Sequence, residues 1–125
     1  MTEMKTAKTI LVVDDDEAHL MIAREILEAE GYSVETHHGA FGATEKALAL
    51  RPDLVLLDVN MPGLSGDRLA GVLQTQRAAR ACQVLLWSSN DEDTLQRTVK
   101  RLGVGGFVCK GDPAALREGV RSLVG

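Results

Sequence analysis

Strand-like segments, most of them short apolar runs, alternate with longer segments that carry apolar residues at helical spacing. An apolar run without alternating polar residues indicates a parallel strand that is buried on both faces. The predicted strands are 9–14, 32–37, 53–58, 83–88 and 105–109, and the predicted helices are 17–30, 40–51, 66–79, 91–102 and 113–123. This alternation is typical of an α/β fold with a parallel sheet.

Residues that begin or end helices lie at the borders of these segments. Asparagine or aspartate before a first turn favours a helix start, while glycine or proline behind a last turn favours a stop. The border residues are Gly31, Pro52, Pro62 with Gly63, Asn90 or Asp91, Gly103, and Asp112 with Pro113. They support the predicted helices independently of the apolar pattern.

Five strand–helix units with right-handed crossovers predict a doubly wound three-layer sandwich with strand order 2-1-3-4-5. This order places the first and third strands side by side. Asp14 and Asp15 follow the first apolar run, Asp58 follows the third, and Lys110 follows the fifth. Ligands bind at the carboxyl ends of the strands in such sheets, so we expect these four residues to converge on one site.

Three neighbouring carboxylates repel one another unless a cation lies among them. Mg²⁺ prefers oxygen ligands in octahedral geometry, and we expect Asp14 or Asp15, Asp58 and a backbone carbonyl near Asn60 to provide them. Asp58 is then a candidate nucleophile toward phosphorus, and Lys110 a clamp for a phosphoryl oxygen. The hydroxyl of Ser88, at the end of the fourth strand, can donate a hydrogen bond to another phosphoryl oxygen.

Two other common uses of this fold do not match the sequence. A nucleotide site needs a glycine-rich turn after the first strand, but residues 14–17 are all acidic and would repel phosphates. A hydrolase with a serine nucleophile on a sharp turn needs a GxSxG motif, which the chain lacks.

Composition and charge narrow the class of protein further. The 125 residues suit one domain, 1–125, with residues 1–8 as a loose lead-in, and 45% of them are hydrophobic. The net charge of −4 argues against binding to nucleic acid or to an anionic membrane. Without a leader or a spanning run we expect a cytoplasmic protein, and Cys82 and Cys109 read as packed apolar residues rather than a disulfide or a zinc site.

Four segments together resemble the receiver domain of two-component response regulators, a flavodoxin-like fold, over nearly the whole chain. They are Ile10–Asp16, Leu56–Gly63, Leu86–Ser89 and Gly103–Lys110. The resemblance implies that Asp58 accepts a phosphoryl group from a histidine kinase or phosphotransfer protein. It also implies that Asp14 and Asp15 form the pocket for Mg²⁺ (or Mn²⁺), and that Ser88, Phe107 and Lys110 act as switch residues.

In the family, the hydroxyl at the position of Ser88 moves toward the phosphoryl group and the aromatic at the position of Phe107 turns inward. The surface formed by the fourth helix, fifth strand and fifth helix then changes for a downstream protein partner. Two departures affect the switch: Gly111 replaces the usual proline after Lys110, and Phe107 has no hydroxyl. The resemblance implies a signalling switch rather than a metabolic enzyme.

Asn60 and Asn90 lie two residues beyond Asp58 and Ser88, where family members tune hydrolysis of the phosphoryl group. Neutral amides can orient a water but cannot act as a base, so we expect an intermediate phosphoryl lifetime. Asn60 also argues against a phosphohydrolase, which would place a second aspartate there.

Several alternatives stay open. A pseudo-receiver would serve as an interaction module that never takes phosphate. Asp14 and Asp15 could cap the first helix, and Asp58 could form a structural ion pair with Lys110. His19, His37 and His38 are assigned no role.

Overall fold

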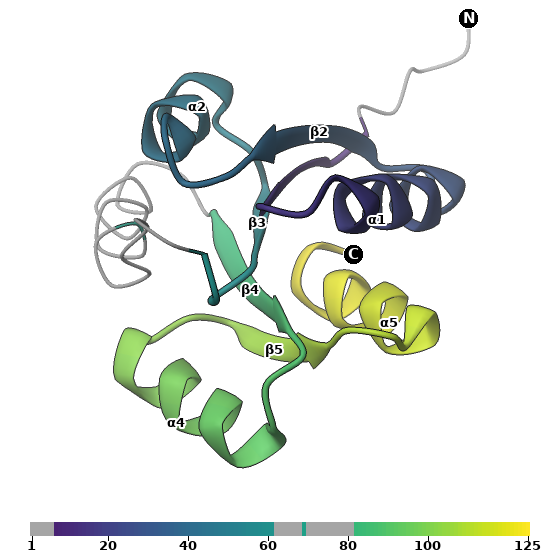
Figure 1. Ribbon diagram of the computed structural model, residues 1–125. Helices are drawn as coiled ribbons and strands as arrows, with labels where there is room; N and C mark the ends of the chain where they lie inside the picture. The colour runs from purple at the N-terminus through teal and green to yellow at the C-terminus, as the bar shows by residue number, and fades with distance from the viewer. Residues whose placement is uncertain (1–6, 62–68, 70–81) are drawn as a thin grey trace, which may run out of the picture.

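A computed structural model describes residues 7–61, 69 and 82–125, and the structural statements below concern these residues. They form a five-stranded parallel sheet with four helices (Figure 1). The strands are β1 (Thr9–Asp14), β2 (Ser33–His38), β3 (Leu54–Leu57), β4 (Gln83–Ser88) and β5 (Gly106–Cys109). The helices are α1 (Glu17–Ala29), α2 (Ala43–Leu50), α4 (Glu92–Leu102) and α5 (Pro113–Val124).

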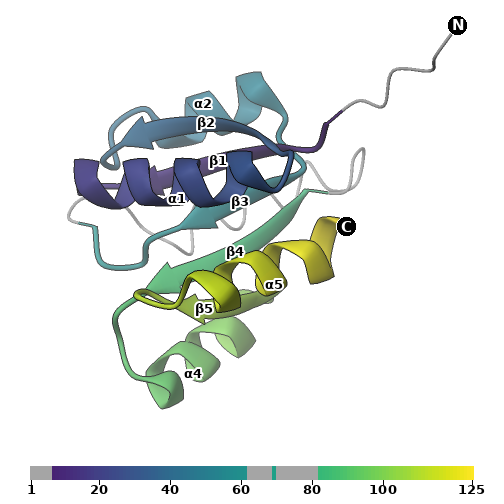
Figure 2. The same cartoon turned by 90° about the vertical axis from the view of Figure 1, so that its right-hand side faces the viewer.

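The sheet order is β2-β1-β3-β4-β5, which confirms the predicted topology. β1 pairs with β3 from Ile10 opposite Leu54 to Val13 opposite Leu57, so both strands end at the same edge. Figures 1 and 2 show α1 and α5 on one face of the sheet and α2 and α4 on the other. The fold is therefore the three-layer sandwich that the sequence pattern predicts.

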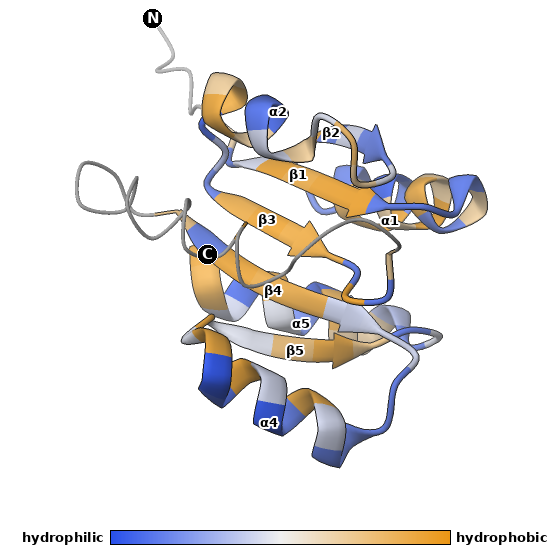
Figure 3. Ribbon diagram, turned by 60° about the vertical axis from the view of Figure 1, so that its left-hand side comes forward, coloured by the Kyte–Doolittle hydropathy of each residue, from blue (hydrophilic) through white to orange (hydrophobic). Residues whose placement is uncertain are grey.

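Two apolar clusters, one on each face of the sheet, explain the unbroken apolar runs. Along β1, Ile10 and Val12 pack toward α1 and α5, while Leu11 and Val13 pack toward α2. All four are fully buried, because helices cover both faces. Figure 3 shows β1, β3 and β4 as the apolar centre of the sheet, whereas the edge strand β2 carries mostly polar residues.

The helix ends follow the predicted chemistry, with α2 as the exception. Asp91 and Asp112 cap α4 and α5 through side-chain bonds to backbone N–H groups, and Gly103 ends α4 in the left-handed region. α2 is shorter than the predicted 40–51, because Gly42 and Arg51 both adopt positive φ and end the helix on each side. The predicted helix 66–79 lies outside the described residues apart from Leu69, which is helical.

Neither cysteine is in a disulfide; Cys82 is buried, as the sequence predicts, whereas Cys109 is only half-buried. Among the described helices, none is both long enough and apolar enough to cross a bilayer.

Candidate functional site

The carboxyl ends of four strands meet at one edge of the sheet and carry most of the predicted site residues. Asp14 is the last residue of β1, and Asp58 follows β3 with its backbone N–H bonded to the carbonyl of Val13 at 3.0 Å. Ser88 ends β4, and its carbonyl accepts a 2.8 Å bond from the backbone N–H of Lys110. The backbone ladder itself therefore brings these side chains together.

Three carboxylates lie close enough to share one cation. Asp14, Asp15 and Asp58 each offer an oxygen within 4.8 Å of the other two. Asp14 is fully buried and Asp58 is 4% exposed, while Asp15 is exposed. Hard oxygen donors at this spacing suit a divalent cation such as Mg²⁺, which keeps part of its water shell. The residues present thus fit the metal that the sequence predicts.

Asp16, which follows Asp15 in the sequence, caps α1. The side chain of Asp16 accepts a 2.9 Å bond from the backbone N–H of Ala18 in the first turn of α1. Asp14 turns back instead, and its Oδ1 accepts a 2.9 Å bond from the N–H of Asp16. The capping role considered for Asp14 and Asp15 is therefore filled by Asp16.

Lys110 neutralises part of the acidic cluster. Its ammonium nitrogen lies 2.7 Å from Asp14 Oδ2 and 3.4 Å from Asp58 Oδ2. The ion pair with Asp58 that was considered as an alternative is present, but Asp14 is the nearer partner. The described chain has no cis peptide bond, and Gly111 adopts a φ of 92°, which favours glycine. Lys110 thus reaches the cluster over a trans peptide.

A second polar group lies beside the acids and involves Ser88, Asn60 and Asn90. The Ser88 hydroxyl is buried and accepts bonds from Asn60 Nδ2 and from the backbone N–H of Asn90, both at 3.1 Å. Asn60 also donates its backbone N–H to Asp58 Oδ1 at 3.0 Å. The two lone-pair positions of Ser88 are therefore used by described residues, and none of these residues takes its hydroxyl proton.

Phe107 lies on β5, the edge strand, half-buried against the cluster that α2 covers. It lines a groove of about 440 Å³ together with Cys109, Glu92 and residues of α5. The position suits the switch role that the resemblance implies, and the switching itself stays a prediction.

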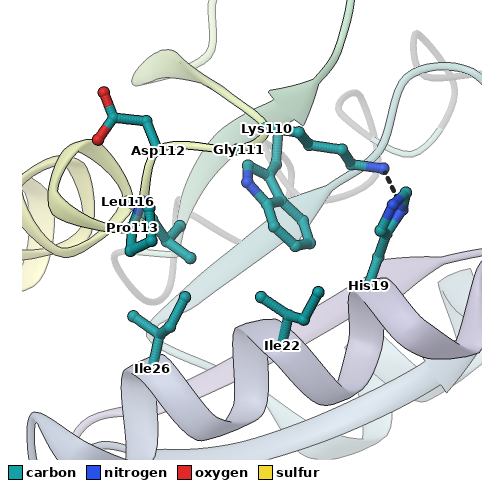
Figure 4. Close-up of a pocket in the computed structure, with 9 residues that line it drawn as sticks. His19, Ile22, Ile26, Lys110, Gly111, Asp112, Pro113 and Leu116 are labelled. Carbon is teal, nitrogen blue, oxygen red and sulfur yellow. Dashed lines mark hydrogen bonds between the residues drawn. The ribbon is translucent and has the colours of Figure 1, made fainter.

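His19 is a site residue that the sequence analysis missed. Its Nδ1 lies 2.9 Å from the Lys110 ammonium (Figure 4). The same nitrogen lies 3.7 Å from Asp14 Oδ1. Its ring packs edge-on against Trp87, with the centroids 6.0 Å apart. The signal for it was position: residue 19 lies in the first turn of α1, directly after the acidic loop.

An apolar cavity of about 320 Å³ adjoins this histidine and lies between α1 and α5. Figure 4 shows Ile22 and Ile26 of α1 facing Pro113 and Leu116 of α5 across it. Lys110 and His19 close its end nearest the carboxylates. The reactive edge of the sheet is thus continuous with an apolar pocket.

The response regulator receiver domain family matches residues 10–121. The polar-differentiation response regulator DivK of Brucella anthropi is 28% identical over 112 residues, which cover 90% of this chain and 77% of DivK. A receiver domain structure from Bermanella marisrubri is 31% identical with a TM-score of 0.81, covering 96% of this chain and 100% of that one. TrrA of Thermotoga maritima, in complex with Mg²⁺-BeF, is 29% identical with a TM-score of 0.81, covering 94% and 99%. The chain therefore belongs to the receiver domains of two-component response regulators.

Proposed function

We propose that Asp58 accepts a phosphoryl group in a Mg²⁺-dependent reaction. Receiver domains bind Mg²⁺ at an aspartate cluster, and this chain has such a cluster. Asp58 is proposed as the phosphoryl acceptor because of the contacts that its Oδ2 makes. Within the described residues that oxygen makes no hydrogen bond, only the 3.4 Å ion pair with Lys110. Both oxygens of Asp14, by contrast, accept short hydrogen bonds.

The reaction needs one bond to form and one to break. Asp58 Oδ2 attacks phosphorus, an O–P bond forms, and the bond from phosphorus to the donor's imidazole nitrogen breaks. A bound Mg²⁺ would neutralise charge on the transferring group, with Asp14, Asp15, Asp58 and the carbonyl of Asn60 as its protein ligands. Lys110 is placed to pair with a phosphoryl oxygen, and Ser88 to donate its free hydroxyl proton to another.

Family membership carries the wider role. Receiver domains are signalling domains that interact with histidine kinases or phosphotransfer proteins. We propose that this chain is one receiver domain over residues 1–125, works in the cytoplasm, and takes its phosphate from such a donor. The groove at β5, beside α4 and α5, would present the output surface to a downstream protein, with no contact to nucleic acid.

Acetyl phosphate with Mg²⁺ tests the proposal without the cognate kinase. Intact-mass measurement should show one added phosphate on the wild type and none on Asp58→Asn. Asp93→Asn, at an exposed position of α4, is the matched control and should be labelled like the wild type. Label that survives Asp58→Asn, or no label on any variant, would overturn the assignment, and the second result would favour the pseudo-receiver.

A further inference from the structure

We infer that His19 is a positioning residue that holds the Lys110 ammonium at the phosphoryl site. The inference rests on the proposed function and adds a residue to it. His19 belongs to α1, whereas Lys110 follows β5, so the contact at 2.9 Å joins two elements at the reactive edge (Figure 4).

The direction of this hydrogen bond follows from the chemistry of the two groups. A lysine ammonium has three N–H donors and no acceptor, so Nδ1 of His19 must accept. The proton of the neutral ring is then on Nε2. That nitrogen lies 3.7 Å from Asp16 Oδ2, where an N–H dipole is favourable. The helix-capping carboxylate therefore supports the tautomer that Lys110 requires.

Trp87 fixes the other side of the lysine. The ammonium nitrogen lies 5.1 Å from the centroid of the Trp87 ring, within the range of a cation–π contact. The His19 ring meets the same indole at an interplanar angle of 67°. Trp87 is 4% exposed and therefore a fixed platform for both groups.

His19 differs from the other partners of Lys110 in one respect that matters for the reaction. Asp14 and Asp58, the two carboxylates that contact the ammonium, are also proposed metal ligands, and Asp58 is the proposed nucleophile. Among the described residues, His19 is the hydrogen-bond partner of the Lys110 ammonium outside that set. It can keep one ammonium proton directed away from the carboxylates while another proton meets the phosphoryl oxygen.

The residue that follows Lys110 does not restrict the lysine side chain. Gly111 has no side chain, and a Cβ built on it would meet nothing within 4 Å. The lysine side chain is therefore held by its contacts with Asp14, Asp58, His19 and Trp87, and not by a bulky neighbour in its own loop.

Rates of phosphorylation by acetyl phosphate at saturating Mg²⁺ and pH 8 test the inference. His19→Leu should react about tenfold more slowly, the effect of losing one hydrogen bond to a charged group. His19→Asn keeps an acceptor oxygen near the place of Nδ1 and should stay within about twofold of the wild type. Glu25→Leu, at an exposed position of the same helix, is the control for a polar-to-leucine change.

A spectroscopic measurement separates positioning from packing and needs no phosphate. Long-range proton–nitrogen NMR spectra of the wild type at pH 8 should show His19 protonated on Nε2 and unprotonated on Nδ1. The slowed exchange of the Lys110 ammonium protons should persist in His19→Asn and be lost in His19→Leu.

An Nδ1–H tautomer, or a His19→Leu variant as fast as the wild type, would overturn the inference. If the wild type takes no phosphate at all, the proposed function fails, and the tautomer and ammonium exchange alone then decide whether His19 holds Lys110.

Discussion

The side chains of Asn60 and Asn90 bond to each other in both directions. Asn60 Nδ2 donates to Asn90 Oδ1 at 2.9 Å, and Asn90 Nδ2 donates to Asn60 Oδ1 at 3.3 Å. The pair links the loop after β3 to the loop after β4, directly beside the Ser88 hydroxyl. Two neutral amides next to the proposed phosphoryl site can orient a water without activating it as a base.

Asn90→Ala should therefore lengthen the lifetime of the phosphorylated protein by about threefold, a small part of what a full general base supplies. The measurement is the decay of phosphate-labelled protein after the donor is removed, with Mg²⁺ held constant. Asp93→Ala, an exposed change nearby, should leave the decay unaltered. An unaltered decay in Asn90→Ala would show that the amide pair does not affect hydrolysis.

Trp87 should report on the site by fluorescence. It is the one tryptophan of the chain and adjoins Ser88. The Lys110 ammonium lies 5.1 Å from its ring centroid. Mg²⁺ would compete with the ammonium for Asp14 and Asp58, so the charge near the indole should shift and the emission should change. Titration with Mg²⁺ and reversal by a chelator measure this, and Asp58→Asn should weaken the response. A flat titration would contradict the placement of the metal beside Lys110.

Removal of the lysine charge should make folding depend on the metal. Lys110→Met leaves Asp14 and Asp58 buried without their cation, at a cost of about 3 kcal/mol in the free energy of unfolding. Saturating Mg²⁺ should restore part of that loss, because a ligand that binds only the folded state stabilises it. Urea unfolding with chelator and with Mg²⁺ gives both values. Equal losses in the two conditions would indicate that lysine and metal do not share the carboxylates.

Sequence reasoning located Asp14, Asp58 and Lys110 because parallel strands end at one edge whatever the details of packing. It considered Asp14 and Asp15 as caps of α1 and did not consider Asp16, although the three acids are chemically alike. The local backbone decides, and it gives the cap to Asp16. The left-handed conformation of Arg51 could not be predicted from the local sequence either. Pro52 predicts a helix stop, but the positive φ of a non-glycine residue depends on the whole loop.

His19 was missed for a similar reason. Its contact with Lys110 joins residues 91 positions apart, and it depends on how α1 lies against the loop between β5 and α5. The apolar stripe of α1 fixes which side faces the sheet, but not how far its first turn extends over the strand ends. Residue contacts set by helix position need the three-dimensional structure.

Asp91 should make α4 sensitive to acid. The backbone N–H of Thr94 donates to its carboxylate at 2.8 Å, and this bond lowers the pKa of Asp91 below the ordinary 3.8. A carboxyl whose pKa is lowered in the folded state stabilises the protein at pH values above its unfolded-state pKa. This stabilisation is lost as the pH falls through the folded-state pKa. Asp91→Asn also caps a helix but does not titrate.

The difference in unfolding free energy between wild type and Asp91→Asn should thus be constant above about pH 5 and move in favour of Asn below it. Urea unfolding across this range measures the trend. A difference that stays constant down to acid pH would mean that the cap is not lost on protonation.

Gly119 should resist the substitution that helix propensity favours. Alanine is about 1 kcal/mol better than glycine inside a helix, but a Cβ at residue 119 would lie 2.7 Å from Val108 Cγ2. The valine is β-branched and buried in the sheet, so its χ1 rotamers are restricted. Gly119→Ala should therefore destabilise the protein by about 1–2 kcal/mol.

In a Val108→Ala background the clash is gone, and the same change should become stabilising by up to about 1 kcal/mol. Urea unfolding of the wild type, the two single variants and the double variant measures the coupling between the two substitutions. If their changes in unfolding free energy simply add, α5 shifts away from β5 rather than packing rigidly against it.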